Sequence, residues 1–170
     1  MGPQDQMTHI VAGNIAPRFV LKSLDHQEYS LHNLMERGPV VAAFFKVSCP
    51  VCQFTFPFVE RLHKLYGSGD VSVLGISQDD ARATKNFASE YGVTFPLLMD
   101  EEGYPVSNAY GLTNVPTIFL IDTDGKVKVS SMGFDKKDLE TIANELAERR
   151  KMALSPLFHP DEVVPANKPG

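Results

Sequence analysis

The chain has 170 residues, of which 43% are hydrophobic and 22% are charged, and such a composition is that of a soluble globular protein with one domain. Sixteen basic and twenty-one acidic side chains give a net charge of −5, which argues against a nucleic-acid partner and against attraction to an anionic membrane. No apolar run reaches the roughly 20 residues of a membrane span, so we expect none.

The chain begins with a polar extension, which we place at residues 1–14. Met1–Thr8 lacks the apolar core of a secretory signal, and the cytoplasm is therefore the expected compartment. The first regular structure expected is an extended pair from Ala16 to Leu31 that turns near Asp25–His26.

A buried strand and a long helix are expected next. Residues 39–45 are apolar without alternation, which is typical of a strand buried on both faces of a sheet. Beyond the strand, apolar residues recur at helical spacing until Gly67, and Pro57 lies within this pattern, where it should kink the helix. The residues concerned are Phe54, Phe58, Leu62 and Leu65.

Strands and helices continue to alternate in the second half of the chain. The expected elements are a strand over 71–76, a helix from Asp80 to Tyr91 that Gly92 ends, a strand over 95–99, a helical turn over 106–110, and strands over 117–121 and 126–130. The last two strands flank Asp122-Thr123-Asp124-Gly125, which is a strong hairpin signal.

The chain should end in a helix and an irregular tail. Asp135 is the expected N-cap of a helix whose apolar stripe contains Leu139, Ile142, Ala143 and Leu146. From Ser155 onward the chain has four prolines and no periodicity, which predicts an irregular and largely exposed tail. We therefore predict one α/β domain over residues 15–152, with a mixed sheet flanked by helices on both faces, and a Pro-rich tail over 153–170.

The only two cysteines of the chain are the ends of one motif, Cys49-Pro50-Val51-Cys52. One helical turn brings Cβ atoms at this spacing close enough to form a disulfide. A strand that leads into such a turn leaves the first sulfur at a helix N-terminus, where free N–H groups and the macrodipole favour a thiolate. The motif therefore predicts a redox site, and it leaves no cysteine for a structural disulfide.

A metal site is the alternative chemistry for two cysteines. Zinc needs four ligands, and the chain has no second cysteine pair. His63 follows Cys52 by eleven residues, which is about 16 Å along a helix and out of reach. We predict no metal and no cofactor, and an inert cysteine pair remains the other alternative.

Several motifs together resemble the thioredoxin-fold proteins. They are Cys49-Pro50-Val51-Cys52 after a buried strand, Pro57 in the following helix, and Val115-Pro116-Thr117 ahead of a hairpin. The closer resemblance is to the bacterial group of alkyl hydroperoxide reductase and thiol-specific antioxidant domains, nearest to the membrane-tethered disulfide reductases of cytochrome maturation. It is carried by residues 16–21, 75–80, 91–96 and 115–122.

The resemblance implies a thioredoxin-like fold, with the N-terminal hairpin as an extension, and a thiol-disulfide oxidoreductase. Cys49 would attack a protein disulfide and Cys52 would resolve the mixed disulfide. Val115, cis-Pro116 and Thr117 would receive the substrate backbone. The implied partners are protein disulfides and an upstream electron donor, and we expect a monomer; the resembling reductases are mostly exported.

Around the cysteines the chain departs from the families that it resembles. Many thioredoxins have a buried acid six residues before the first cysteine, where this chain has Ala43. The cytochrome-maturation reductases often have a glutamate three residues after the second cysteine, where this chain has Thr55. Because Cys52 lacks an obvious base, we hypothesise that water, or Lys46 as a local charge, tunes its ionisation.

Two other functions are compatible with this resemblance. A peroxiredoxin would use Cys49 as its peroxidatic cysteine. Such an enzyme has a threonine or serine at the position of Lys46 and a proline at the position of Ala42, and this chain has neither. A non-catalytic thioredoxin-fold binding module is the second alternative.

Overall fold

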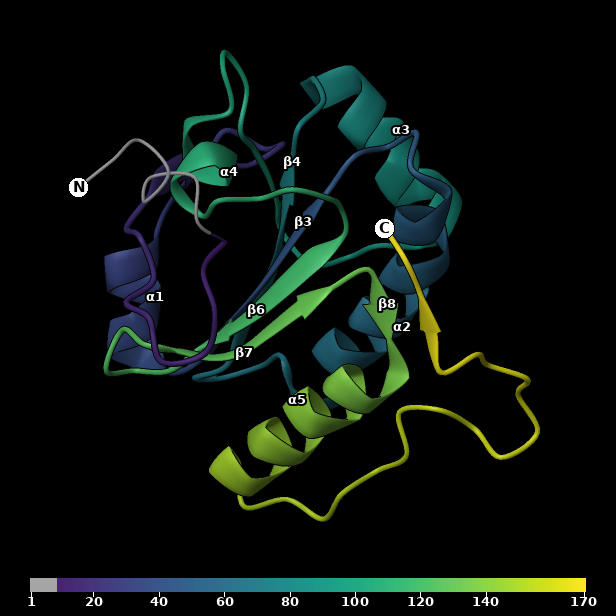
Figure 1. Cartoon of the computed structure of the whole chain (residues 1–170). Helices are drawn as coiled ribbons and strands as arrows, with labels where there is room; N and C mark the ends of the chain where they lie inside the picture. The colour runs from purple at the N-terminus through teal and green to yellow at the C-terminus, as the bar shows by residue number, and fades with distance from the viewer. Residues whose placement is uncertain (1–8) are drawn as a thin grey trace.

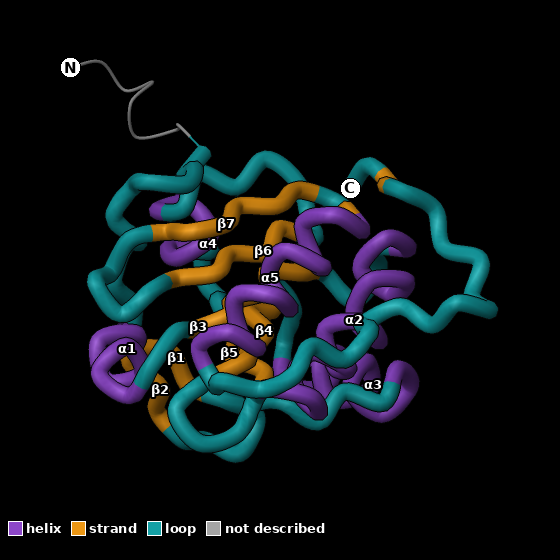
Figure 2. Tube along the Cα trace, turned by 90° about the horizontal axis from the view of Figure 1, so that it is seen from below, coloured by secondary structure: helices purple, strands orange, loops and turns teal. Residues whose placement is uncertain are grey.

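The computed structural model describes residues 9–170 and is built on a five-stranded sheet with helices on both faces (Figures 1 and 2). The strand order is β5-β4-β3-β6-β7, and β3, β4 and β5 are parallel while β6 and β7 are antiparallel to their neighbours. The strands are Val40–Phe45 (β3), Ser72–Ser77 (β4), Leu97–Met99 (β5), Thr117–Ile121 (β6) and Val127–Met132 (β7). The predicted α/β class with a mixed sheet is therefore confirmed.

Strand β3 is the centre of the sheet, and all six of its residues are buried. Because successive side chains point to opposite faces, Val41, Ala43 and Phe45 pack into one hydrophobic cluster, whereas the alternate residues pack into the other. Two buried faces explain why the strand shows no alternation in the sequence.

Helices α2 (Pro50–Tyr66), α3 (Ala81–Tyr91) and α5 (Lys136–Arg149) cover one face of the sheet. The ring centroids of Phe45 on β3 and Phe56 on α2 lie 4.4 Å apart, and Phe87 on α3 lies 4.8 Å from Phe45. This aromatic packing fixes the N-terminal half of α2 against the end of β3.

The opposite face is covered by helices α1 (Leu31–Arg37) and α4 (Pro105–Ala109) and by the N-terminal segment. The predicted hairpin is present as β1 (Val20–Lys22) and β2 (Glu28–Ser30). Helix α1 was not predicted. It has only seven residues, and burial of Leu31, Leu34 and Met35 stabilises it, so tertiary packing rather than its own periodicity decides it.

The caps expected from the sequence lie at helix termini. Asp80 accepts a hydrogen bond from the Ala83 N–H at 2.8 Å, and Asp135 accepts one from the Asp138 N–H at 2.9 Å. Gly92 ends α3 in the left-handed conformation, as a C-terminal glycine should.

The C-terminal tail packs against the domain, so the prediction of a largely exposed tail is wrong at two residues. Leu157 and Phe158 are 3% and 9% exposed, and the Phe158 ring lies 4.9 Å from that of Phe58 on α2. Further on, β9 (Asn167–Lys168) pairs antiparallel with β8 (Phe134–Asp135). In Figure 1 the yellow tail leaves α5, passes outside α2 and returns to β8. Two apolar residues are too few to form a periodic signal.

The predicted N-terminal extension is only partly described, because residues 1–8 lie outside the described chain. From Ile10 onward the segment follows the sheet: the Ile10 N–H donates to the Tyr110 carbonyl, and the Gly13 N–H donates to the Val127 carbonyl. None of the helices within residues 9–170 has both the length and the apolar composition of a membrane span.

Candidate active site

Cys49 and Cys52 lie where β3 ends and α2 begins. Cys49 is the N-cap of α2, and its Sγ accepts a hydrogen bond from the Cys52 N–H at 3.1 Å. The Cys49 side chain is half-buried, whereas Cys52 is fully buried, and the two sulfurs are not bonded to each other. The first sulfur thus lies at a helix N-terminus, where an N–H group stabilises negative charge.

Two hydrogen bonds hold the loop between β3 and α2 in place. The Gln53 side chain donates to the Val47 carbonyl at 2.9 Å, and the Val47 N–H donates to the Asp79 carboxylate at 2.8 Å. Pro50 occupies the first turn of α2, where its missing N–H costs little. Both peptide groups of Val47 are therefore held, which limits the movement of Cys49 two residues later.

The environment of Cys52 favours its neutral thiol. Burial raises the pKa of Cys52 well above that of an ordinary thiol, and the adjacent Cys49 sulfur and the negative charge of Asp79 raise it further. The backbone N–H of Lys46 has the opposite effect on this pKa. The second cysteine is therefore a buried proton donor that needs help to ionise.

This pKa shift predicts selective alkylation. In the reduced, folded protein at about pH 8.5, where an ordinary thiol is half ionised, we expect iodoacetamide to modify Cys49 and to spare Cys52. Because the pKa of Cys52 is higher in the folded than in the unfolded chain, its contribution to stability is complete below about pH 8.5 and is lost as the pH rises further. Peptide mass spectrometry measures the labelling, and the urea-unfolded protein is the control. Equal labelling of both cysteines in the folded protein would contradict the prediction.

The Val115-Pro116-Thr117 loop lies beside the cysteines. The peptide bond between Val115 and Pro116 is cis, and the Val115 carbonyl oxygen lies 3.5 Å from the Cys49 sulfur. The Pro116 carbonyl accepts from the Gly133 N–H, which joins this loop to the end of β7. Pro116 and Thr117 are buried and Val115 is half-buried, so Val115 is the one of the three that the surface reaches.

The other residues singled out from the sequence are placed less directly. The Lys46 side chain is exposed, and the residue lines a small cavity of about 160 Å³ together with Gln78 and Val115. The Thr55 hydroxyl donates to the Val51 carbonyl of its own helix at 2.6 Å. Thr55 therefore does not replace the glutamate that the resembling reductases have there.

Sequence reasoning missed Asp79 as a residue of this site. Its carboxylate holds the cysteine loop through the Val47 N–H, and its charge acts on Cys52. A signal was available: Asp79 follows β4, the parallel neighbour of β3. The carboxyl ends of parallel neighbours meet at the same edge of a sheet.

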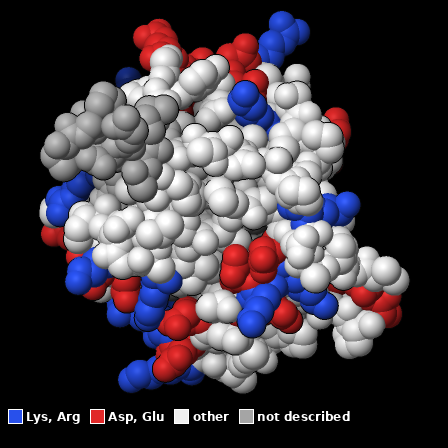
Figure 3. All heavy atoms as spheres, viewed as in Figure 1, with Lys and Arg blue, Asp and Glu red and all other residues white. Residues whose placement is uncertain are grey.

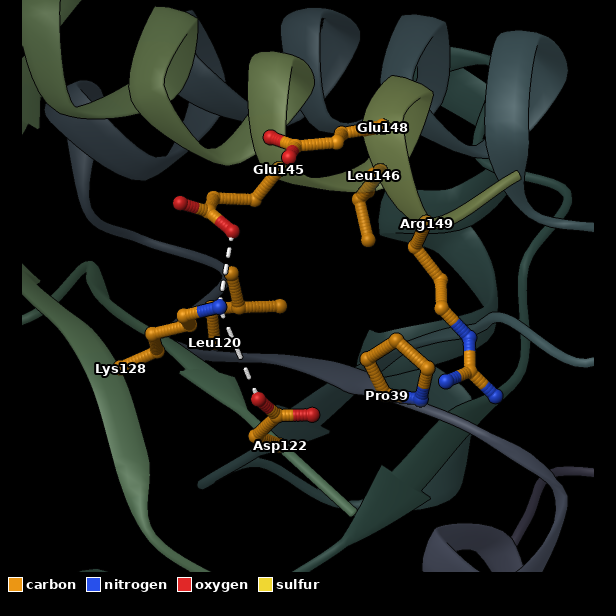
Figure 4. Close-up of a pocket in the computed structure, with 8 residues that line it drawn as sticks. All are labelled: Pro39, Leu120, Asp122, Lys128, Glu145, Leu146, Glu148 and Arg149. Carbon is orange, nitrogen blue, oxygen red and sulfur yellow. Dashed lines mark hydrogen bonds and ion pairs between the residues drawn. The ribbon is translucent and has the colours of Figure 1, made fainter. Parts of the chain in front are cut away.

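Two features of the rest of the molecule do not involve the cysteine pair: the charged margin of the surface and a cavity with charged lining residues. Figure 3 shows a central region with few charged side chains over β6 and the loop before it, and charges gathered around the margin. A cavity of about 260 Å³ lies at the far end of the sheet, between α5 and β6, where Lys128 bridges Asp122 and Glu145 (Figure 4). Within residues 9–170, no cluster of three or more His, Cys, Asp or Glu side chains could hold a metal ion.

Comparisons with known proteins agree on one family and one fold. The model of the AhpC/TSA family matches residues 12–130. The chain is 33% identical over 137 residues to the thiol-disulfide oxidoreductase ResA of Geobacillus thermodenitrificans, covering 79% of this chain and 78% of that protein.

Two solved structures share the fold. A putative thiol:disulfide interchange protein DsbE from Chlorobium tepidum superposes with a TM-score of 0.72 at 24% identity, covering 82% of this chain and 97% of that one. Peroxidoxin BcpB from Mycobacterium tuberculosis superposes with a TM-score of 0.68 at 26% identity, covering 85% of this chain and 99% of that one.

Proposed function

The chain belongs to the AhpC/TSA family and is a thiol-disulfide oxidoreductase, and we propose that Cys49 is its nucleophile and Cys52 its resolving thiol. The observation that carries this division of roles is the difference in position between the two sulfurs. Cys49 is half-exposed and accepts a helix N–H, whereas Cys52 is fully buried behind it. Only the first sulfur can meet a disulfide that arrives from solvent.

The reduction of a substrate then takes two exchange steps. The Cys49 thiolate attacks one substrate sulfur, so a mixed disulfide forms, the substrate S–S bond breaks, and the released substrate thiolate takes up a proton. Cys52 loses its proton and attacks the Cys49 sulfur. The Cys49–Cys52 disulfide forms, the second substrate thiolate leaves, and two electrons have passed to the substrate.

We propose that the substrate chain lies along Val115. An extended peptide can pair with exposed main-chain groups, and the Val115 carbonyl is next to the attacking sulfur. Pro116 and Thr117 act from behind this surface: the Thr117 hydroxyl donates to the Asn114 carbonyl at 2.8 Å and holds the loop in shape.

Asp79 is our candidate for the proton acceptor of Cys52. Its negative charge makes a small contribution to the raised pKa of Cys52, and its carboxylate is anchored to the cysteine loop through the Val47 N–H. Lys46 is the alternative as a local positive charge that assists the ionisation of Cys52, and it lines the small cavity beside Val115. Its backbone N–H already acts on Cys52, whereas its ammonium group lies on an exposed side chain.

The substitution Asp79→Asn tests this assignment, because asparagine can still accept the hydrogen bond from the Val47 N–H. We expect the release of substrate from the mixed disulfide to slow by about 100-fold at neutral pH, the lower end of a general base's usual contribution. Rapid-quench measurements of the mixed disulfide across a pH series give the rate. The matched variant is Lys46→Ala. A slower release in Lys46→Ala alone would indicate that the positive charge of Lys46 assists the ionisation of Cys52, and unchanged release in both variants would leave water as the proton acceptor.

Protein disulfides are the proposed substrates, with a separate thiol donor that reduces the Cys49–Cys52 disulfide again. We also propose that the protein works as a monomer, because one chain contributes both cysteines and the Val115 loop. The cytoplasmic location stays a prediction.

A peroxidase is the second candidate function, and the similarity to peroxidoxin BcpB favours it. The residues before Cys49 do not: Lys46 and Ala42 occupy the positions where a peroxiredoxin has a threonine or serine and a proline. Measuring peroxide consumption and insulin reduction on one sample separates the two activities.

A further inference from the structure

The C-terminal segment 155–170, here called the strap, is anchored along α2. Leu157 and Phe158 are buried in the core cluster. Arg61 of α2 donates two hydrogen bonds to the Glu162 carboxylate, at 2.7 and 2.6 Å. The family match ends at residue 130, so the strap lies outside the part of the chain that matches.

From this anchor the strap runs to the loops beside the cysteines. Strand β9 pairs with β8, and the Lys136 N–H donates to the Ala166 carbonyl at 2.9 Å. The Lys168 ammonium lies 5.0 Å from the centroid of the Phe54 ring. Phe54 follows Cys52 by two residues on α2. Both Figure 1 and Figure 2 show the end of the strap beside the start of α2 and the end of the sheet.

The last residues of the strap lie against two backbone positions. The carbonyl of Lys168 packs on Gly133, where there is no room for a Cβ. Gly170 packs against the carbonyl of Val115, again too closely for a side chain. This is the carbonyl that lies 3.5 Å from the Cys49 sulfur. The strap therefore occupies backbone next to the reactive sulfur, on the loop proposed to receive substrate.

The strap end is held loosely compared with its anchor. Residues 165–167, 169 and 170 are exposed, and β9 is only two residues long. Short exposed segments with few buried apolar contacts open at low free-energy cost. A larger ligand can therefore displace the end while Leu157 and Phe158 stay in the core.

We propose that the strap determines the specificity of the exchange reaction. A small disulfide reaches Cys49 with the strap in place, whereas a polypeptide disulfide must first displace residues 167–170 from Val115. This inference rests on the proposed function, because it assumes that Cys49 is the nucleophile and that the substrate chain lies along Val115.

The test uses Gly170→Val, because a side chain at this position meets the Val115 carbonyl and forces the strap end away. A second variant, lacking residues 167–170, removes the end and leaves the anchor. Val163→Ala is the matched control, since Val163 belongs to the strap and is 100% exposed. The pre-reduced proteins are mixed with insulin or with hydroxyethyl disulfide, and the rate of loss of the Cys49–Cys52 dithiol is followed.

We expect both strap variants to reduce insulin about tenfold faster, because the competent fraction rises, while hydroxyethyl disulfide changes by less than about twofold. Unchanged or slower insulin reduction in both variants, or an equal gain for both substrates, would overturn the proposal. The proposed function has a separate readout. It fails if the Cys49→Ser variant still reduces hydroxyethyl disulfide, which does not depend on the strap.

Discussion

Insulin reduction is expected to fall to the uncatalysed rate when Cys49 is replaced by serine. A serine hydroxyl at the N-cap of α2 can still accept the Cys52 N–H, so the helix keeps its cap. At neutral pH, however, a hydroxyl without an adjacent base is a very weak nucleophile compared with a thiolate. Turbidity of the precipitating insulin B chain, with dithiothreitol as the electron donor, measures the rate.

The matched variant is Cys52→Ser, which keeps the attacking sulfur and loses the resolving one. It should attack insulin once and then accumulate as a mixed disulfide, visible as a covalent adduct on a non-reducing gel. The opposite pattern, an adduct in Cys49→Ser and none in Cys52→Ser, would mean that the two roles are reversed. Insulin reduction at the parent rate by both variants would remove the cysteine pair from the reaction.

The largest loss of stability is expected for Phe119→Ala. Phe119 is fully buried on β6, with ring centroids 5.7 Å from Phe44 and 5.1 Å from Tyr110. Removing a buried aromatic ring costs about 3–5 kcal/mol, because the transfer free energy is lost and a cavity remains. This is a large fraction of the about 5–15 kcal/mol that stabilises a domain.

Urea unfolding followed by circular dichroism measures this loss as a lower midpoint with an unchanged slope. Val20→Ala is the control, because Val20 lies on β1 and is 57% exposed, and it should change the free energy of unfolding by less than about 0.5 kcal/mol. If Phe119→Ala lowers the free energy of unfolding by less than about 1 kcal/mol, the hydrophobic cluster that contains Phe44, Tyr110 and Phe119 must relax around the cavity.

The sequence alone determined the elements whose causes are local. A spacing of three residues placed Cys49 and Cys52 on one helical turn, and Asp80 and Asp135 became N-caps because the hydrogen bond closes within three residues. The unbroken apolar run of β3 identified a strand with two buried faces. Each of these signals acts within one turn or one strand, so it can be followed along the chain without knowing the fold.

The resemblance to a family predicted one contact between segments that are far apart in the sequence. The sulfur of Cys49 and the carbonyl of Val115 are 66 positions apart in the chain. No periodicity or spacing connects them, and only the motif Val115-Pro116-Thr117 suggested that they meet.

Only the tertiary structure decided the position of Asp79 and the course of the strap. The Asp79 carboxylate reaches Val47 because two parallel strands end at one edge, which is a property of the sheet rather than of either strand. Phe158 is buried because Phe58 and Phe134, which are distant in the chain, offer it an apolar surface. Leu157 is buried in the same hydrophobic cluster. Burial of this kind depends on a surface that exists only after folding, so the residues that it covers show no pattern of their own.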